Sequence, residues 1–249
     1  MRLLTSPDDE GQAPELDPDA VRDLYPWPEG RRWVRAMMVT ALDGAAVGPD
    51  GLSGTISSTA DRLVFDAVRR LADVVVIGAE TLRAEGYQPM KAKAEDAEIR
   101  AEQGLAPAPV LSVVSGSLDL PWHRPELAEA ASSMLVITGS GADPKRLDRA
   151  REHAEVVQLP GQRVAGADVL DELSGRGLTR IVCEGGPRFL ADLIAADLVD
   201  EADITVSPTF AGTEKSPVTP TIEPRRFRIA QVLTGDDFLM MRYLRRGES

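Results

Sequence analysis

The segment 181–194 constrains the fold more than any other part of this sequence. Residues 181–183 form an apolar run typical of a β-strand, and Glu-Gly-Gly-Pro follows at 184–187. Apolar residues then recur at helical spacing over 189–194. The two glycines let the backbone turn sharply and let a ligand approach without meeting a Cβ, and Pro187 suits the first helical position. The sequence therefore predicts a strand, a tight turn and a helix whose free N-terminus favours a phosphate.

A second junction of this type follows the apolar run Val74–Ile77, which we expect to be a strand buried on both faces. It leads directly into Gly78-Ala79-Glu80-Thr81. In the first junction, Glu184 stands at the carboxyl end of its strand, where open α/β sheets place their ligands. The residues leave one alternative open, in which the two glycines form only a turn and Glu184 is a solvated acid.

Strands and helices alternate from Trp33 onward, and the end of the chain is rich in β-formers. Gly235-Asp236-Asp237 separates two closing strands and predicts a hairpin. We therefore predict an α/β fold with a mixed, mostly parallel sheet that is flanked by helices. The charged segment 91–104 has little apolar periodicity and is expected to be an exposed insertion.

Residues 1–30 contain eight acids, two arginines and five prolines, which predicts an extended or poorly ordered acidic arm before a domain at 31–246. Apolar residues in the second half of the arm can attach it to that domain. They are Leu16, Val21, Leu24, Tyr25 and Trp27.

The net charge of −12 argues against a general nucleic-acid binder and against binding to anionic membranes. No apolar run is long enough to predict a membrane span. Cys183 is the only cysteine, so it forms no intrachain disulfide, and a cytoplasmic location is the default expectation. Together with two histidines it cannot build a recognisable zinc site, and we expect it to be a small buried hydrophobic residue.

Several strand ends carry Gly, Ser or Thr, among them Gly78, Ser115 and residues 138–141. A row of backbone N–H and hydroxyl donors along a sheet edge suits an extended cofactor that bears phosphates. The sequence has no G-x-G-x-x-G dinucleotide fingerprint after its first strand, no Walker loop and no G-x-S-x-G nucleophile elbow.

Five segments occur in the order and spacing of the riboflavin-biosynthesis reductase domain. They are Val39-Thr40-Ala41-Leu42-Asp43-Gly44, Gly51-x-Ser53-x-x-Ile56-Ser57-Ser58, Val76-Ile77-Gly78-Ala79-Glu80-Thr81-Leu82-Arg83-Ala84, Glu184-Gly185-Gly186-Pro187 and Leu198-Val199-Asp200-Glu201. Over roughly residues 33–244 the chain resembles the stand-alone pyrimidine reductases of that family, which have a dihydrofolate-reductase-like fold. The resemblance implies an NADPH-dependent reductase of a pyrimidine ribosylamine 5′-phosphate, usually a homodimer, with hydride transfer to the opened ribose.

The resemblance also implies roles for individual residues. Those facing NADPH would be Thr55, Gly78, Ala79, Thr81, Glu85, Gly185, Gly186, Pro187, Arg188 and Phe189, with Arg83, Ser115 and Arg188 near its 2′-phosphate. Those facing the substrate would be Ser53, Arg69 and Glu184, with Asp43 on the floor of the pocket. Glu184 is the first candidate for a catalytic acid or orienting group, and Asp43 is the second. For Asp43 the alternative is a residue that only supports an Asp-Gly turn.

The sequence departs from the family pattern in two places. Met37 stands where the riboflavin reductases carry a lysine, and the run 85–92 lacks their substrate-phosphate arginine. Lysine is a poor substitute for an arginine that binds in a bidentate manner. Two alternatives to the riboflavin reaction therefore remain, namely a reductase of another ring such as a dihydropterin, and a protein that binds NADPH without turnover.

Overall fold

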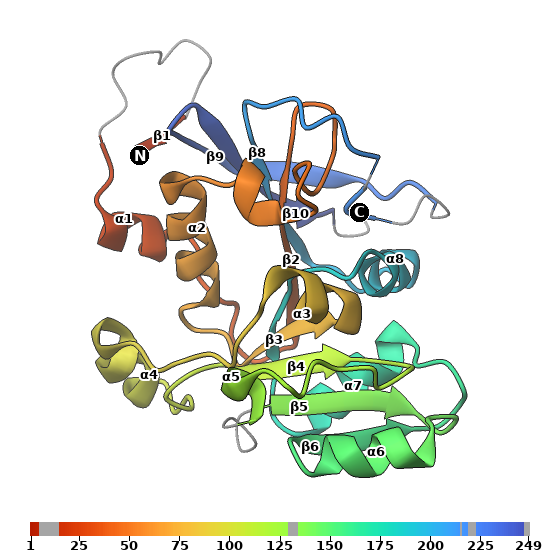
Figure 1. Ribbon diagram of the computed structural model, residues 1–249. Coiled ribbons are helices and arrows are strands. Elements are labelled where there is room, and N and C mark those ends of the chain that lie inside the picture. The colour runs from red at the N-terminus through yellow and green to blue at the C-terminus, as the bar shows by residue number, and fades with distance from the viewer. Residues whose placement is uncertain (5–14, 129–133, 215, 219–222, 247–249) are drawn as a thin grey trace.

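The computed structural model describes residues 1–4, 15–128, 134–214, 216–218 and 223–246. They form one ten-stranded sheet with helices on both faces (Figure 1). The strands are β1 (Arg2–Leu3), β2 (Trp33–Thr40), β3 (Val74–Gly78), β4 (Val110–Val114), β5 (Met134–Gly139), β6 (Glu155–Leu159), β7 (Arg180–Cys183), β8 (Glu201–Val206), β9 (Phe227–Gly235) and β10 (Phe238–Arg245). The helices are α1 (Pro18–Asp23), α2 (Thr59–Arg69), α3 (Ala79–Glu85), α4 (Ala97–Glu102), α5 (Pro125–Ala128), α6 (Pro144–Arg151), α7 (Gly166–Gly175) and α8 (Pro187–Ala195), with short 3-10 turns η1 (Ser53–Ile56) and η2 (Ala94–Asp96).

The strand order is β1-β9-β10-β8-β2-β7-β3-β4-β5-β6. The strands from β8 to β6 run parallel, whereas β10, β9 and β1 add an antiparallel edge. The predicted mixed, mostly parallel sheet is therefore confirmed, and so is the closing hairpin, which joins β9 to β10 at Gly235. In the described part of the chain no helix is long and apolar enough to cross a membrane.

Strand β3 shows why the sheet is covered on both sides. Val75 and Ile77 belong to one apolar core, which includes side chains of α2 and α3, while Val74 and Val76 belong to a second core under α7 and α8. All four are fully buried, as predicted for this run. Cys183 lies in the second core, and burial raises the pKa of its thiol to about 12. The prediction of a small buried hydrophobic residue at Cys183 is thus confirmed.

The N-terminal segment packs onto this domain where it is described. Strand β1 pairs with β9, and Val21, Tyr25 and Trp27 are buried in the first core. The predicted attachment of residues 15–30 is therefore confirmed. Residues 5–14, which belong to the predicted arm, lie outside the described residues, and the division at residue 30 stays a prediction.

Most of segment 91–104 is exposed, as expected, but Asp96 and Arg100 are buried and attach the segment to the domain. Arg100 donates through Nε and Nη1 to the backbone carbonyls of Ala106, Arg70 and Ala72 at 2.7 to 3.1 Å, whereas its buried Nη2 has no hydrogen-bond partner among the described residues.

A cluster of buried charges lies on β2, β8 and β10. Glu201 accepts hydrogen bonds from Trp33 Nε1 at 2.8 Å and Arg242 Nε at 2.7 Å, and Arg35 Nε lies 3.1 Å from it. Burial works to raise the pKa of Glu201, but the two guanidinium groups outweigh it and leave this pKa below its usual value. Asp203, two residues along β8, has both carboxyl oxygens buried without a hydrogen-bond partner among the described residues. Burial and then the charge of Glu201 raise the pKa of Asp203 well above its usual value.

We expect Asp203→Asn to stabilise the protein at high pH. A raised folded-state pKa means that wild-type stability falls as pH rises from the ordinary aspartate range toward that pKa, because the unfolded chain gives up this proton while the folded protein keeps it. The neutral amide removes this loss. In urea unfolding at about pH 8, the free energy of unfolding should be larger for the variant than for the wild type. This difference should shrink toward about pH 4, where the unfolded chain is also half protonated at this residue. A gap that stays constant with pH, or a wild type that is the more stable at high pH, would contradict the neutral state of Asp203.

Candidate functional site

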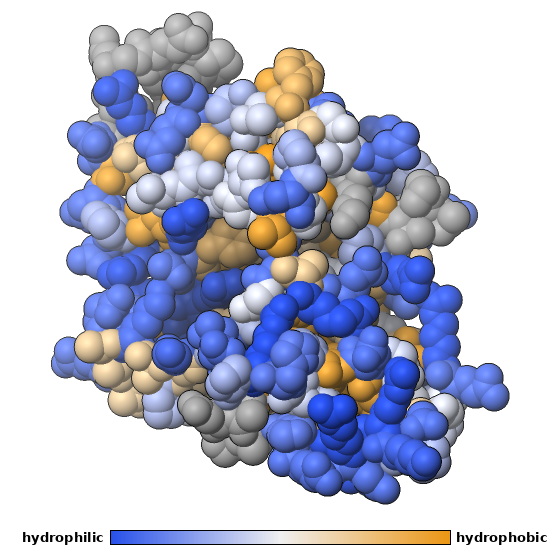
Figure 2. Space-filling view, viewed as in Figure 1, coloured by the Kyte–Doolittle hydropathy of each residue, from blue (hydrophilic) through white to orange (hydrophobic). Residues whose placement is uncertain are grey.

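Two adjoining cavities lie at the carboxyl ends of the central strands. Cavity A is mainly apolar, and Figure 2 shows apolar atoms set back among polar side chains near the middle of this view. Cavity A is lined by Met37, Met38, Val39, Ala46, Val47, Gly51, Ser53, Phe65, Glu80, Thr81, Ala84, Glu85, Tyr87, Glu184, Gly185, Gly186, Pro187, Ser216 and Pro217. Cavity B is lined by Gly78, Ala79, Glu80, Arg83, Val114, Ser115, Gly116, Ser117, Gln162, Arg163, Val164, Gly186, Pro187, Arg188, Phe189 and Asp192.

The turn between β7 and α8 forms the wall that the two cavities share. Gly185 and Gly186 both have positive φ, at 99° and 84°, which side chains rarely adopt. A Cβ on Gly186 would lie 3.0 Å from the Cα of Gly78, whereas a Cβ on Gly185 would meet only Thr81 Oγ1, at 4.0 Å. The sequence predicted that both glycines leave space for a ligand. For Gly186 this prediction is corrected, because the backbone of Gly78 occupies the space where its Cβ would lie.

Glu184 is held by two neighbours at the end of β7. Its side chain is 1% exposed, and Arg69 donates to both carboxylate oxygens through Nε and Nη2. The hydroxyl of Tyr87 donates to Oε2 at 2.7 Å. Burial and then the charge of Glu184 raise the pKa of Tyr87 well above its usual value, so the phenol stays a neutral donor. Burial lowers the pKa of Arg69, but the charge of Glu184 outweighs it and leaves that pKa raised. A carboxylate in such a bidentate pair acts as a hydrogen-bond acceptor.

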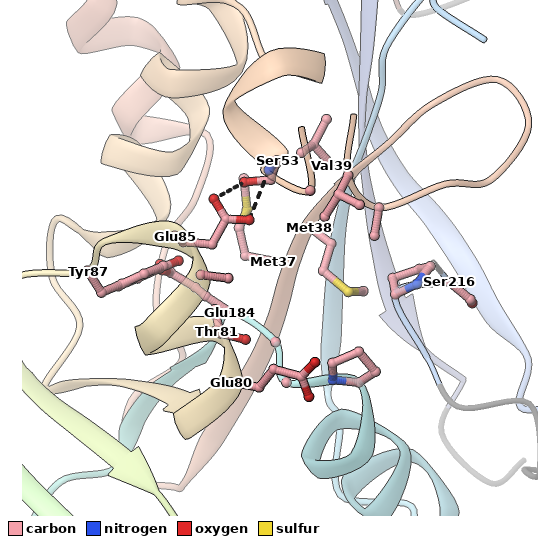
Figure 3. Close-up of a pocket in the computed structure, with 18 of the residues that line it drawn as sticks. Met37, Met38, Val39, Ser53, Glu80, Thr81, Glu85, Tyr87, Glu184 and Ser216 are labelled. Carbon is pink, nitrogen blue, oxygen red and sulfur yellow. Dashed lines mark hydrogen bonds between the residues drawn. The ribbon is translucent and has the colours of Figure 1, made fainter. Parts of the chain in front are cut away.

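A second carboxylate of cavity A is engaged by the 3-10 turn η1. The backbone N–H and the hydroxyl of Ser53 donate to Glu85 at 2.9 and 3.0 Å (Figure 3). The structure thus brings together Ser53, Thr81, Glu85 and Glu184 from the predicted set. It places Glu85 in cavity A, beside the predicted substrate residue Ser53.

Three predicted residues are not among the described residues that line either cavity, namely Asp43, Thr55 and Arg69, and Arg69 is connected to cavity A through Glu184. Asp43 is exposed, and its carboxylate accepts from the N–H groups of Gly212 at 2.7 Å and Ala45 at 3.3 Å. The hydrogen bond from Gly212 is the main reason why the pKa of Asp43 is lowered. The prediction of Asp43 on the pocket floor is therefore corrected to a turn-supporting position. Thr55 is exposed as well, and its hydroxyl donates to Asp50.

Cavity B holds the remaining predicted cofactor residues. Gly78, Ala79, Arg83, Ser115, Arg188 and Phe189 all line it, together with Arg163, which the sequence analysis missed. Helix α8 begins at this cavity with Gly186 as its N-cap and has no side-chain hydrogen bond at the cap. Ser115 Oγ accepts from the N–H of Leu118 at 3.0 Å, which fixes its position in a turn and leaves its O–H available as a donor. Three guanidinium groups beside a helix N-terminus make cavity B a favourable place for an anion, although the whole chain is acidic.

The sequence analysis named Met37 only as a departure from the family pattern, and it missed Phe65 and the contact of Tyr87 with Glu184. Met37 and Phe65 lie on β2 and α2, and Tyr87 follows Gly86, which ends α3 with a φ of 65°. A glycine in this conformation reverses the chain after a helix, which is what turns Tyr87 back toward Glu184. Gly86 was the one sequence signal for this placement. Among the described residues, no group of three or more His, Cys, Asp and Glu side chains could hold a metal ion.

The family model described as RibD C-terminal domain matches residues 32–238, which is most of the chain. This chain belongs to the RibD C-terminal domain family. The predicted membership in the riboflavin-biosynthesis reductase family is therefore confirmed.

Two relatives have the same curated name, 2,5-diamino-6-ribosylamino-4(3H)-pyrimidinone 5′-phosphate reductase. That of Archaeoglobus fulgidus is 27% identical over 187 residues, covering 75% of this chain and 85% of the relative. That of Methanothermobacter thermautotrophicus is 28% identical over 182 residues, covering 73% and 80%. A pyrimidine reductase-like protein from Corynebacterium diphtheriae has a similar structure, with a TM-score of 0.83, 23% identity and coverage of 92% of this chain and 99% of that one. The structural similarity to the Corynebacterium diphtheriae protein confirms the predicted fold.

We expect Gly186→Ala to destabilise the fold more than Gly185→Ala. Both variants place a side chain at positive φ, which costs about 1 kcal/mol or more. Only Gly186→Ala also pushes a methyl group into the backbone of Gly78, so its loss in unfolding free energy should be larger by about 1–3 kcal/mol. Chemical denaturation of the two variants side by side measures the difference. Equal losses would contradict the close backbone contact.

Proposed function

We propose that this chain catalyses the NADPH-dependent reduction of a pyrimidine ribosylamine 5′-phosphate, with hydride transfer to the opened ribose. The observation that carries the proposal is the meeting of cavities A and B at Gly186 and Pro187. One cavity suits an anionic cofactor and the other a partly apolar ring, and hydride transfer requires the two ligands in contact. The curated names of the two archaeal relatives support this substrate.

The residues of cavity B fit a dinucleotide that bears phosphates. The uncapped start of α8 offers backbone N–H groups to a phosphate, and Arg83, Arg163 and Arg188 offer positive charge. Arg163 also contacts Asp192 at 3.2 Å, which leaves Arg83 and Arg188 without an ion pair among the described residues. The cofactor supplies the hydride, and these residues bind and orient it. We assign the preference for NADPH to Arg83 and Arg188, because an additional phosphate needs additional positive charge.

In cavity A, Glu184 positions the acceptor. Because Arg69 and Tyr87 already donate to its oxygens, the carboxylate suits accepting a hydrogen bond from an amino or ring N–H group of the acceptor. Of the two roles that the sequence suggested for Glu184, a catalytic acid or an orienting group, this is the orienting group. For Asp43, whose oxygens hold a turn outside the cavity, we propose no catalytic role.

One observation favours the alternative of a different ring substrate. Met37 is fully buried and lines cavity A at the point where the riboflavin reductases, by the resemblance, carry a lysine. A thioether offers no charge to a ribose phosphate, but it packs well against a flat ring. Assays should therefore include a dihydropterin beside the pyrimidine substrate.

We also propose that the chain is a cytoplasmic homodimer. Ile229 on β9 and Leu239 on β10 are 58% and 40% exposed, and they lie on the antiparallel part of the sheet. Exposed apolar side chains on adjacent strands are what a second copy would cover. A single buried thiol suits a reducing compartment.

NADPH consumption tests the proposal directly. We expect loss of NADPH absorbance only when the pyrimidine ribosylamine 5′-phosphate is added, and binding of NADPH about tenfold tighter than NADH by nicotinamide fluorescence. Arg188→Ala should narrow that preference while NADH affinity stays within about twofold. Turnover with the dihydropterin alone would favour the alternative substrate. Tight NADPH binding without turnover of either compound would contradict an enzyme and favour a cofactor-binding protein.

We expect Glu184→Gln to lower kcat/KM by about 100-fold with NADPH affinity within a few-fold of wild type, because Glu184 lines cavity A only. Asp96→Asn is the matched control. The carboxylate of Asp96 pairs at 2.9 Å with Arg70, the residue that follows Arg69 in the sequence. Asp96 lines neither cavity. Both variants lose an ion pair and some stability, but only Glu184→Gln should lose turnover. Equal kcat/KM in the two folded variants would contradict a substrate-positioning role.

A further inference from the structure

Three of the described residues line both cavities, namely Glu80, Gly186 and Pro187. Glu80 is the only one of the three with a titratable side chain. It is the second residue of α3 and is exposed, and Figure 3 shows its side chain extending toward the segment that leads into α8. Its carboxylate therefore stands where a ligand in cavity B meets a ligand in cavity A.

The other carboxylates of the two cavities are already engaged. Glu184 accepts from Arg69 and Tyr87, Glu85 accepts twice from Ser53, and Asp192 lies 3.2 Å from Arg163. Among the described residues, no hydrogen bond or ion pair involves the carboxylate of Glu80. Glu80 thus carries the negative charge that is free to interact with a ligand at the junction.

A negative charge at this point distinguishes the two forms of a nicotinamide cofactor. The reduced ring is neutral, and the ring that has given up its hydride carries one positive charge. When the hydride reaches the acceptor carbon, that molecule also takes a proton, which balances the reaction. A carboxylate about 4 Å from a unit positive charge changes an affinity about fivefold even in a water-like dielectric.

We propose that Glu80 is a charge-stabilising residue, which binds the oxidised nicotinamide ring in preference to the reduced ring and so favours hydride transfer. This inference rests on the proposed function, because it places the nicotinamide at the junction. It assigns to Glu80 a contact with the cofactor that neither the sequence motifs nor the family membership assign.

Separate titrations of NADP⁺ and NADPH test the inference without any acceptor. In Glu80→Gln we expect the dissociation constant of NADP⁺ to rise about fivefold and that of NADPH to stay within about twofold, measured by calorimetry. Glu80→Asp keeps the charge and should restore most of the preference. Circular dichroism should report a wild-type fold for both variants, because the side chain is exposed and has no partner to lose.

Asp192→Asn is the matched control, since it removes one negative charge from cavity B at a residue that does not line cavity A. It should change the affinities for both cofactor forms by the same factor. A Glu80→Gln variant whose two affinities change equally, or not at all, would overturn the role of Glu80 and leave the proposed function standing. A wild-type protein that binds neither form would contradict the proposed function itself, and the inference with it.

Discussion

The backbones of Gly78 and Gly186 lie against each other so closely that a Cβ at either position would lie 3.0 to 3.1 Å from the Cα of the other. The N–H of Gly78 also donates to the carbonyl of Gly185 at 3.2 Å, which ties the end of β3 to the turn after β7. Helices α3 and α8 begin directly after these glycines, so their N-terminal ends are held side by side. The wall between the two cavities, and the position of Glu80 beside it, follow from this one contact.

The distribution of charge around that wall gives each cavity its own chemistry. Cavity B collects Arg83, Arg163 and Arg188 in a chain whose net charge is −12, whereas the charged lining of cavity A is acidic among the described residues. An elongated ligand with phosphates at one end and a neutral ring at the other would therefore bind in one direction. Glu184, which lines cavity A, is held by an ion pair with Arg69 and by a hydrogen bond from Tyr87.

Local sequence patterns predicted the elements of this fold. Of the site, they predicted only the parts that the backbone forms, which are strand ends and turns. The apolar run of β3 and the Gly185–Gly186 turn were found because buried parallel strands and positive-φ turns need particular residue types. The contacts of Tyr87, Arg100 and Asp43 could not be predicted, because each depends on a partner that the fold brings near from elsewhere in the chain. Asp43 illustrates the limit, since an Asp-Gly pair reads the same whether its carboxylate faces a cavity or holds the N–H of Gly212.

Transfer of label from the cofactor tests the central claim that the two cavities hold a hydride donor and its acceptor in contact. The protein would be mixed with the pyrimidine ribosylamine 5′-phosphate and NADPH that carries deuterium at both hydrogens of the nicotinamide C4. A product with a single deuterium on the former ribose carbon, detected by mass spectrometry, is the result expected from direct transfer across the junction. A reduced product without deuterium, or intact labelled NADPH after long incubation with the folded protein, would contradict the account.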